Sequence, residues 1–522
     1  MFDFIIVGAG SAGCVLANRL TEDSTVKVLL LEAGCPDKKQ EIQIPAAFPK
    51  LFKTECDWAY FTEELEQMDR RRMFWPRGKT LGGSSSINAM VYSRANRGDH
   101  DLWRELGIEG WGYDDILPYY KKSENNERGA NEFHGVGGEL NVADLRCINP
   151  LTHRFIEAAQ GAGLKYNKDL NGASQEGVGY LQVTQKNGKR HSAAAAFLKP
   201  VLSRANLTVK TSAHVTRLLF DKTKAVGVEF VQDGKTEQAR VNREVILSGG
   251  TINSPQTLML SGIGPADHLR ALGIPVVADL PGVGENLQDH LLIGVEYECR
   301  EPIGLHKADT VKNILNFLIF KNGPLTSNVA EAAGFLKTDS SSVAPNIELV
   351  FAPVFYMDNG FANPDLHGFS IGIALQKPES RGHIKLKSKD PLAAPAIQPN
   401  YLASETDLIA CIEGVKLARE ILNSKHFDRF RGKEWWPGDG SKTDDGIAGH
   451  IRQTAETIYH PVGTCKMGSD VMAVVDDRLR VRGVEGLQVV DASVIPVQIT
   501  GHTNAPVMAI AEKGANLIKA RA

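Results

Sequence analysis

Several features that would place a protein in a special class are missing from this sequence. Its seven cysteines are scattered, odd in number and free of any Cys-x-x-Cys pair. This pattern argues against a disulfide framework or a zinc site, so we expect reduced thiols and no metal. The formal net charge of −3 is close to balance, and it indicates no nucleic-acid partner.

A long hydrophobic run is also missing. No apolar stretch approaches the roughly 20 residues that a membrane-spanning helix needs. The most apolar segment is Ile314 to Phe320. We interpret it as a partly buried helix, with a surface that rests on a membrane as the alternative. A peripheral membrane contact therefore stays open.

The sequence also shows no room for a leader peptide. Only seven residues precede Gly8, and they already form the first predicted strand, so we expect no secretory or transit segment. The expected location is the cytoplasm, with association at the inner face of the membrane as a second possibility.

Size and composition indicate a large soluble enzyme or binding protein. A chain of 522 residues with 42% hydrophobic and 23% charged residues is typical of a globular protein. It is too long for one compact core, which predicts two lobes.

The N-terminal stretch predicts a dinucleotide site. A β-prone run from Phe2 to Val7 ends at a Gly-x-Gly-x-x-Gly turn formed by Gly8, Gly10 and Gly13. A helical segment follows, and a second strand ends on Glu32, 19 residues after Gly13. The glycines admit a pyrophosphate, the helix start offers free N–H groups, and the carboxylate accepts hydrogen bonds from ribose hydroxyls. An acid at position 32 argues against a 2′-phosphate, which leaves NAD and FAD.

Three more segments are rich in glycine and small residues. They are Arg77-Gly78-Lys79-Thr80-Leu81-Gly82-Gly83-Ser84-Ser85-Ser86-Ile87-Asn88, Gly249-Gly250-Thr251-Ile252-Asn253-Ser254-Pro255, and Leu260-Ser261-Gly262-Ile263-Gly264. Together with the N-terminal turn they resemble the glucose-methanol-choline (GMC) flavoprotein oxidoreductases over essentially the whole chain. Among subgroups, the sequence looks most like the bacterial alcohol and choline dehydrogenases.

The resemblance implies FAD and an α/β fold. The expected architecture is an FAD-binding Rossmann-like domain of the glutathione-reductase type, with a second α+β substrate domain built on an antiparallel sheet. The FAD domain is expected to be discontinuous, formed by residues 1–45, 77–100, 190–296 and 455–522. The substrate-binding or capping domain is then formed by residues 46–76, 101–189 and 297–454. Some members attach the flavin through a histidine, but the matching position here is Ile87, so we predict non-covalent FAD.

The resemblance, together with the N-terminal motif, also assigns cofactor contacts residue by residue. The expected contacts are Gly8, Gly10, Ser11, Ala12, Gly13, Glu32, Ala33, Trp58, Arg77, Leu81, Gly82, Gly83, Ser84, Asn88, Ala89, Met90, Val91, Val215, Gly249, Asp491, Ala492, His502, Thr503, Asn504 and Pro506.

The catalytic residues are expected near the C-terminus. An alcohol releases hydride readily only as its hydroxyl proton leaves, and an imidazole accepts that proton near neutral pH. The family's catalytic histidine, in its His-Pro-x-Gly-Thr motif, falls on His460, and the second position of the pair falls on His502. Many alcohol and choline dehydrogenases have Asn at that second position, so His502 points toward the oxidase branches. By contrast, His290 is expected to be structural.

The leading hypothesis is therefore oxidation of a primary alcohol to the aldehyde, with His460 as general base and hydride transfer to flavin N5. The electron acceptor is expected to be a quinone, an artificial dye or O2. The alternatives are an oxidase acting on aryl or furanic alcohols, a light-driven fatty-acid decarboxylase, and a non-catalytic flavin-binding protein. His460 counts against the decarboxylase.

Overall fold

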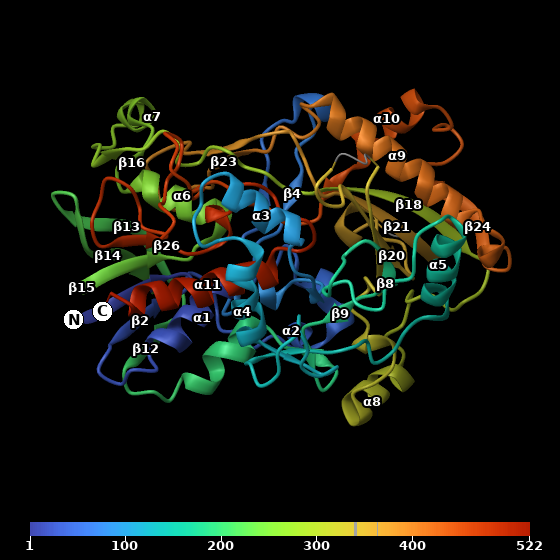
Figure 1. Ribbon diagram of the computed structural model, residues 1–522, viewed down its shortest axis with the longest axis horizontal. Coiled ribbons are helices and arrows are strands. Elements are labelled where there is room, and N and C mark those ends of the chain that lie inside the picture. The colour runs from blue at the N-terminus through green and yellow to red at the C-terminus, as the bar shows by residue number, and fades with distance from the viewer. Residues whose placement is uncertain (339–341, 363, 522) are drawn as a thin grey trace.

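The molecule is built on two large β-sheets with helices packed around them. The computed structural model describes residues 1–338, 342–362 and 364–521. Figure 1 shows the two large sheets side by side along the longest axis, and both termini lie at the end that carries the first sheet. The helices are α1 Ser11–Leu20, α2 Gln40–Gln43, α3 Arg97–Glu105, α4 Tyr113–Ser123, α5 Pro150–Gly161, α6 Gly250–Leu260, α7 Ala266–Ala271, α8 Val311–Phe320, α9 Glu405–Leu422, α10 Asp444–Thr454 and α11 Asn504–Lys519.

The first sheet is built on the predicted N-terminal unit. Its order is β12-β2-β1-β15-β14-β13, with β26 also paired to β15. The pairings among β12, β2, β1, β15 and β26 are parallel, and the β15-β14-β13 end is antiparallel. The strands are β1 Phe2–Val7, β2 Val28–Leu31, β12 Leu207–Lys210, β13 Ala213–Asp221, β14 Lys224–Gln232, β15 Lys235–Leu247 and β26 Leu487–Val489. The predicted strand, turn, helix and strand order is confirmed.

The second sheet is antiparallel throughout. Its order is β24-β18-β21-β20-β19-β8, and β25 pairs with β18. The strands are β8 Gly177–Tyr180, β18 Leu291–Cys299, β19 Ala332–Leu336, β20 Ile347–Ala352, β21 Gly368–Leu375, β24 Arg431–Trp436 and β25 Glu456–Thr457. An α/β domain joined to an antiparallel-sheet domain is the fold class that the resemblance implied.

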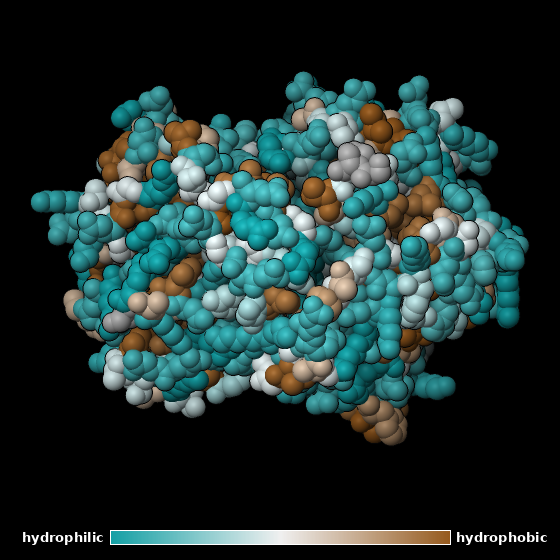
Figure 2. Space-filling model, viewed as in Figure 1, coloured by the Kyte–Doolittle hydropathy of each residue, from teal (hydrophilic) through white to brown (hydrophobic). Residues whose placement is uncertain are grey.

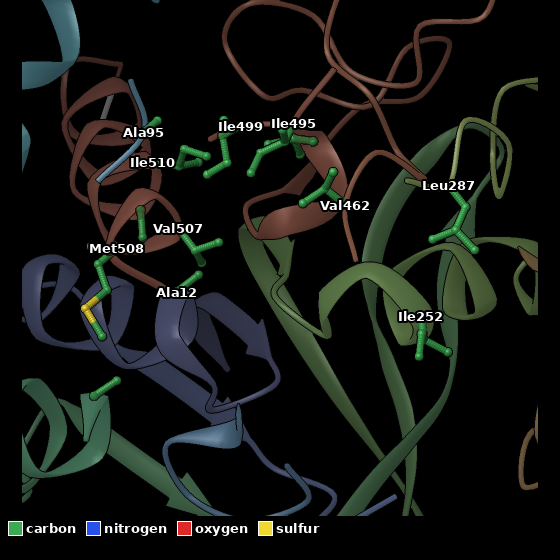
Figure 3. Packing of buried hydrophobic residues seen from close by; sticks show 14 of the residues in the cluster. Ala12, Ala95, Ile252, Leu287, Val462, Ile495, Ile499, Val507, Met508 and Ile510 are labelled. Carbon is green, nitrogen blue, oxygen red and sulfur yellow. The ribbon is translucent and has the colours of Figure 1, made fainter. Parts of the chain in front are cut away.

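Helix α11 brings the end of the chain back to its beginning. Val507 and Met508 are buried, and Figure 3 shows them beside Ala12 of α1. The Ser11 hydroxyl donates to Asn504 Oδ1 at 2.7 Å, so the N-terminal ends of the two helices meet. This packing places residues that are almost 500 positions apart at one site.

The 314–320 segment is helical, as predicted, but less of it is buried than a core-facing helix would bury. The segment is helical, as part of α8, but only Phe317 is buried. No helix among the described residues is both long and apolar enough to cross a bilayer.

Candidate active site

A single cavity of about 320 Å³ extends between residues of the two sheets. One end is lined by the N-terminal glycine turn and by the start of α11, and the other by β18, β20 and β21 of the second sheet. The two ends therefore suit different tasks. The first resembles a nucleotide cradle, and the second, called the chamber below, is the part of the cavity lined by the second sheet.

The glycine turn is open on the side that faces the cavity. A Cβ built on Gly10 would have no heavy atom nearer than Gly83 Cα at 3.9 Å, whereas a Cβ on Gly13 would lie 1.9 Å from Gly8 O. Gly13 therefore serves close backbone packing, while Gly10 leaves free space at the first turn of α1. That turn contains no acidic side chain, so its N–H groups and positive dipole end can meet a diphosphate.

Glu32 closes the second strand as predicted, and it is held by the backbone. Its two carboxylate oxygens accept hydrogen bonds from the Ala9 and Gly34 N–H groups, both at 2.8 Å. Burial raises the pKa of Glu32 to about 7, and these two bonds act in the opposite direction. Each oxygen keeps a second lone pair for a ribose hydroxyl.

The second glycine segment lies against the first. Gly82 N–H donates to Ala9 O at 2.7 Å, and a Cβ on Gly83 would lie 2.7 Å from Gly10 Cα. The two loops therefore share one backbone surface at the wall of the cavity. Ile87, buried in the same segment, presents an aliphatic side chain there.

Most of the predicted cofactor contacts line this cavity. Those that do so are Gly8, Gly10, Ser11, Ala12, Glu32, Ala33, Trp58, Arg77, Gly83, Ser84, Asn88, Ala89, Met90, Val91, Val215, Gly249, Asp491, Ala492, His502, Thr503 and Asn504. Gly13, Leu81, Gly82 and Pro506 do not. They support the wall from behind, because each is engaged in packing between the loops or inside a helix turn.

The Asp491 side chain has a structural task at the start of α6. It accepts hydrogen bonds from Gly250 N–H, the Ser254 hydroxyl, and the backbone and hydroxyl of Ser493. Four protein donors occupy its two oxygens. A cofactor contact at this position therefore falls to the backbone of Asp491 and Ala492 rather than to the carboxylate.

The two predicted catalytic histidines meet at the other end of the cavity. The rings of His460 and His502 have centroids 4.6 Å apart, and both residues line the cavity. A third histidine completes the group, because His290 Nδ1 lies 3.1 Å from His460 Nδ1. The backbone of His460 is held by Asp289, which accepts its N–H, and by the Gln498 amide, which donates to its carbonyl.

A buried chain of polar groups holds His502. Its Nε2 lies 3.1 Å from Glu348 Oε1. Gln376 Nε2 donates to the other oxygen of Glu348, and Gln376 Oε1 accepts from Gly501 N–H, next to the histidine. Glu348 lies in β20, and Gln376 directly follows β21 of the same sheet. That sheet therefore fixes the orientation of a residue carried by the C-terminal segment.

The surroundings keep His460 neutral. Burial is the largest cause, followed by His502, His290 and Arg77, and together they hold the pKa of His460 well below its usual range. Burial likewise lowers the pKa of His290 to about 3. At neutral pH both rings are therefore uncharged.

The chamber wall was only partly visible in the sequence. Tyr356 and Trp436 line the cavity, whereas the nearby Phe351 and Phe355 are buried scaffold. The main omissions are Leu292, Gly294, Glu296, Val350, Ser370 and Gly372. They alternate along β18, β20 and β21 and face one side of the sheet. The alternation of these residues can be read from the sequence, but the sequence does not tell which face of the sheet borders the cavity.

Comparison with known proteins identifies the family. The models of the N- and C-terminal parts of GMC oxidoreductases match residues 2–292 and 378–511. Alcohol dehydrogenase [acceptor] of Pseudomonas putida is 45% identical over 527 residues, which cover 99% of this chain and 96% of the relative. The mitochondrial choline dehydrogenase of Mus musculus is also 45% identical, with 99% and 89% covered.

Solved structures agree. Pyridoxine 4-oxidase from Mesorbium loti has a TM-score of 0.91 at 33% identity, with 99% of each chain covered. Formate oxidase from Aspergillus oryzae RIB40, a protein studied for modification of its FAD, has a TM-score of 0.93 at 29% identity, with 100% and 98% covered. The present chain belongs to the GMC oxidoreductase family and is an FAD-dependent oxidoreductase.

Proposed function

We propose that this protein oxidises a primary alcohol to the aldehyde, with His460 as the general base. The observation that carries the proposal is the position of the neutral His460 ring in the chamber, with Nδ1 engaged by His290 and its backbone fixed on both sides. A neutral imidazole at this place can accept the hydroxyl proton of a bound alcohol.

The contact with His290 is compatible with the tautomer of His460 that a general base needs. If Nδ1–H of His460 donates to Nδ1 of His290, the lone pair of His460 is on Nε2, the ring nitrogen left for a substrate. His290 then carries its own proton on Nε2. The same contact stabilises the imidazolium formed when Nε2 takes the proton, since Nδ1–H remains donated.

The chamber wall favours an apolar alcohol. Apolar surface lines much of the chamber. It comes from Phe48 in the segment Pro45–Leu51, from Phe52 directly after that segment, and from Leu292, Val350 and Tyr356. Such a wall gains free energy from burying an aliphatic or aryl chain. We therefore expect longer aliphatic and aryl alcohols to react better than glycerol or sugars.

The residues around the glycine turn fit FAD. When bound, FAD supplies the two-electron acceptor of the reaction. Gly10, Ser11 and Asn504 would hold its diphosphate and neighbouring groups through the free space and helix starts described above. Ile87 has no nucleophilic atom, which supports non-covalent binding. Flavin released into the supernatant on acid precipitation is the expected result, and flavin that stays with the polypeptide would contradict it.

Replacement of the base tests the proposal. We expect His460→Ala to keep its flavin but to reduce it at least about 100-fold more slowly with alcohol, which is the usual scale for a positioned acid or base. The measurement is flavin absorbance after anaerobic mixing with a panel of alcohols. Bleaching at the wild-type rate would refute the role of His460.

Oxidase activity is the second candidate, because a histidine occupies position 502, where many dehydrogenases of this family have asparagine. Admitting air to the anaerobically reduced protein distinguishes the two. Reoxidation within the turnover time indicates an oxidase, and slow reoxidation indicates a dehydrogenase that uses a quinone or a dye.

For the location of the protein in the cell we propose the cytoplasm.

A further inference from the structure

Helix α8 exposes an apolar stripe to solvent. Val311, Ile314, Leu315, Leu318 and Ile319 have between 40% and 75% of their surface exposed. Their spacing of three and four places them on one side of the helix, which in a soluble protein normally faces the core. Here the only side chain of the helix that is buried is Phe317, on the opposite side.

The helix also projects from the body of the molecule. Figure 1 shows α8 below the second sheet, and Figure 2 shows hydrophobic residues at the tip of this projection. Phe320, at the end of the helix, is 70% exposed. A contiguous exposed surface of this kind normally marks an interaction site.

The charged residues next to the stripe are mainly basic. Lys312 is the only charged residue within α8, and Lys321 follows at its C-terminal end. Arg146 lies beside this end and donates to Lys321 O. Asp309, the nearest preceding acid, pairs with Lys50 at 3.5 Å. The apolar stripe is therefore flanked by Lys312 and Lys321, and α8 itself contains no acidic residue.

From this arrangement we propose that α8 docks the protein on an anionic lipid bilayer surface. A short helix that inserts apolar side chains to the depth of the headgroups, with lysines beside them, has the features of an interfacial anchor. A second copy of the chain fits less well. A helix of about 15 Å that stands out from the body offers less than the roughly 800 Å² per partner of a stable dimer.

The position of α8 connects this surface to the chamber. The helix packs against the short turn Pro324–Thr326, and that turn packs against Pro45–Leu51, which carries Phe48 into the cavity wall. A bilayer at α8 would therefore lie near the apolar side of the chamber. The docking itself does not depend on the reaction proposed above.

Vesicle flotation of the flavin-loaded protein tests the proposal. We expect the wild type to float with vesicles of phosphatidylcholine and phosphatidylglycerol, and less with phosphatidylcholine alone. The double variant Leu318→Glu with Ile319→Glu should bind at least about tenfold less, because it puts two charges into the apolar stripe. Lys312→Glu should weaken binding about fivefold or more on the anionic vesicles only.

Val471→Glu is the matched control, since Val471 is 78% exposed outside α8 and the variant should float like the wild type. Flavin content and alcohol oxidation measured without vesicles should be unchanged in all variants. Failure of the wild type to float, or flotation of the double variant like the wild type, would overturn the proposal. A concentration-dependent dimer that the double variant abolishes, without vesicle binding, would overturn it in favour of a second copy.

Discussion

The contact between His290 and His460 gives the sharpest test of how the base is prepared. In the proposed tautomer, His290 accepts the Nδ1–H of His460 across 3.1 Å. Replacement by phenylalanine keeps a flat ring in the same space but removes the acceptor. The Nδ1–H of His460 is then buried without this partner. The loss costs more free energy in the imidazolium than in the neutral ring, because a buried charged donor depends more strongly on its hydrogen bond.

The size of the effect follows from the cost of that lost bond. A hydrogen bond to a charged group contributes about 1.5 to 3 kcal/mol, and each 1.36 kcal/mol is a factor of ten in rate. We therefore expect His290→Phe to reduce flavin about 10- to 150-fold more slowly. The effect should appear in the rate at saturating alcohol, because the bond strengthens as His460 takes the proton.

The assay is anaerobic stopped-flow reduction at several alcohol concentrations, with flavin content and thermal unfolding as controls for folding. His290→Gln is the matched variant, since its amide oxygen can still accept from Nδ1 and should restore part of the rate. A His290→Phe protein that holds flavin and reduces it as fast as the wild type would refute this role and the assigned tautomer.

Three further predictions use other parts of the site. His502→Asn should remain active but slower. Because His502 lowers the pKa of His460, the acid limb of the kcat/KM profile of this variant should move to higher pH. An acid limb at lower pH, or total inactivity, would mean that the roles of the two histidines are reversed. Burial raises the pKa of Glu296 to about 8, so the folded state progressively loses stability as the pH rises from the unfolded value of about 4.3 to about 8. Thermal unfolding should therefore show Glu296→Gln gaining more stability over the wild type at pH 9 than at pH 5. An equal gain at both pH values would contradict the cause. Gly10→Val should preserve the unfolding temperature of the flavin-free protein but lower its affinity for flavin. Gly13→Ala should instead destabilise the fold itself, since the added Cβ would lie 1.9 Å from Gly8 O. Equal behaviour of the two variants in thermal unfolding and flavin titration would show that Gly10 does not face the cofactor.

Local sequence pattern predicts those parts of the fold that depend only on neighbouring residues. The strand, glycine turn and helix from Phe2 to Leu20 were predictable, because period and turn chemistry act within a few residues. The pairing of His460 with His502 came from the family motifs, and the ring contact at 4.6 Å is consistent with it. Four predicted contacts, among them Gly13 and Pro506, support the wall instead of lining it.

The residues that hold the histidines could not be found in this way. Glu348 reaches His502 only because β20 pairs with β21 in one particular register, in which Glu348 lies opposite Ala374. Register depends on contacts across the whole sheet, and a shift of one residue would turn Glu348 away from the site. The local sequence around Glu348 therefore gives no sign of its contact with His502.

The small buried part of helix α8 shows another limit of local sequence pattern. Its apolar stripe has the period of a core-facing helix, and local pattern then predicts burial. Exposure of Leu318 and Ile319 is decided by what the rest of the chain leaves uncovered. The same sequence pattern is compatible with a core and with a surface that docks on something else. For this reason the disagreement between pattern and burial is itself the evidence for a docking site.

The second sheet explains why the reaction chemistry can be separated from cofactor binding in this fold. The first sheet and the starts of α1 and α11 form the cradle, and they depend on backbone groups and glycines. The second sheet supplies Glu348, which lies against His502, and the apolar residues of the chamber wall. Changes along β18, β20 and β21 can therefore alter the substrate while the cradle is unchanged. A variant such as Val350→Ala should accordingly shift preference among alcohols at constant flavin content, and a parallel loss of flavin would show that the two functions are not separable.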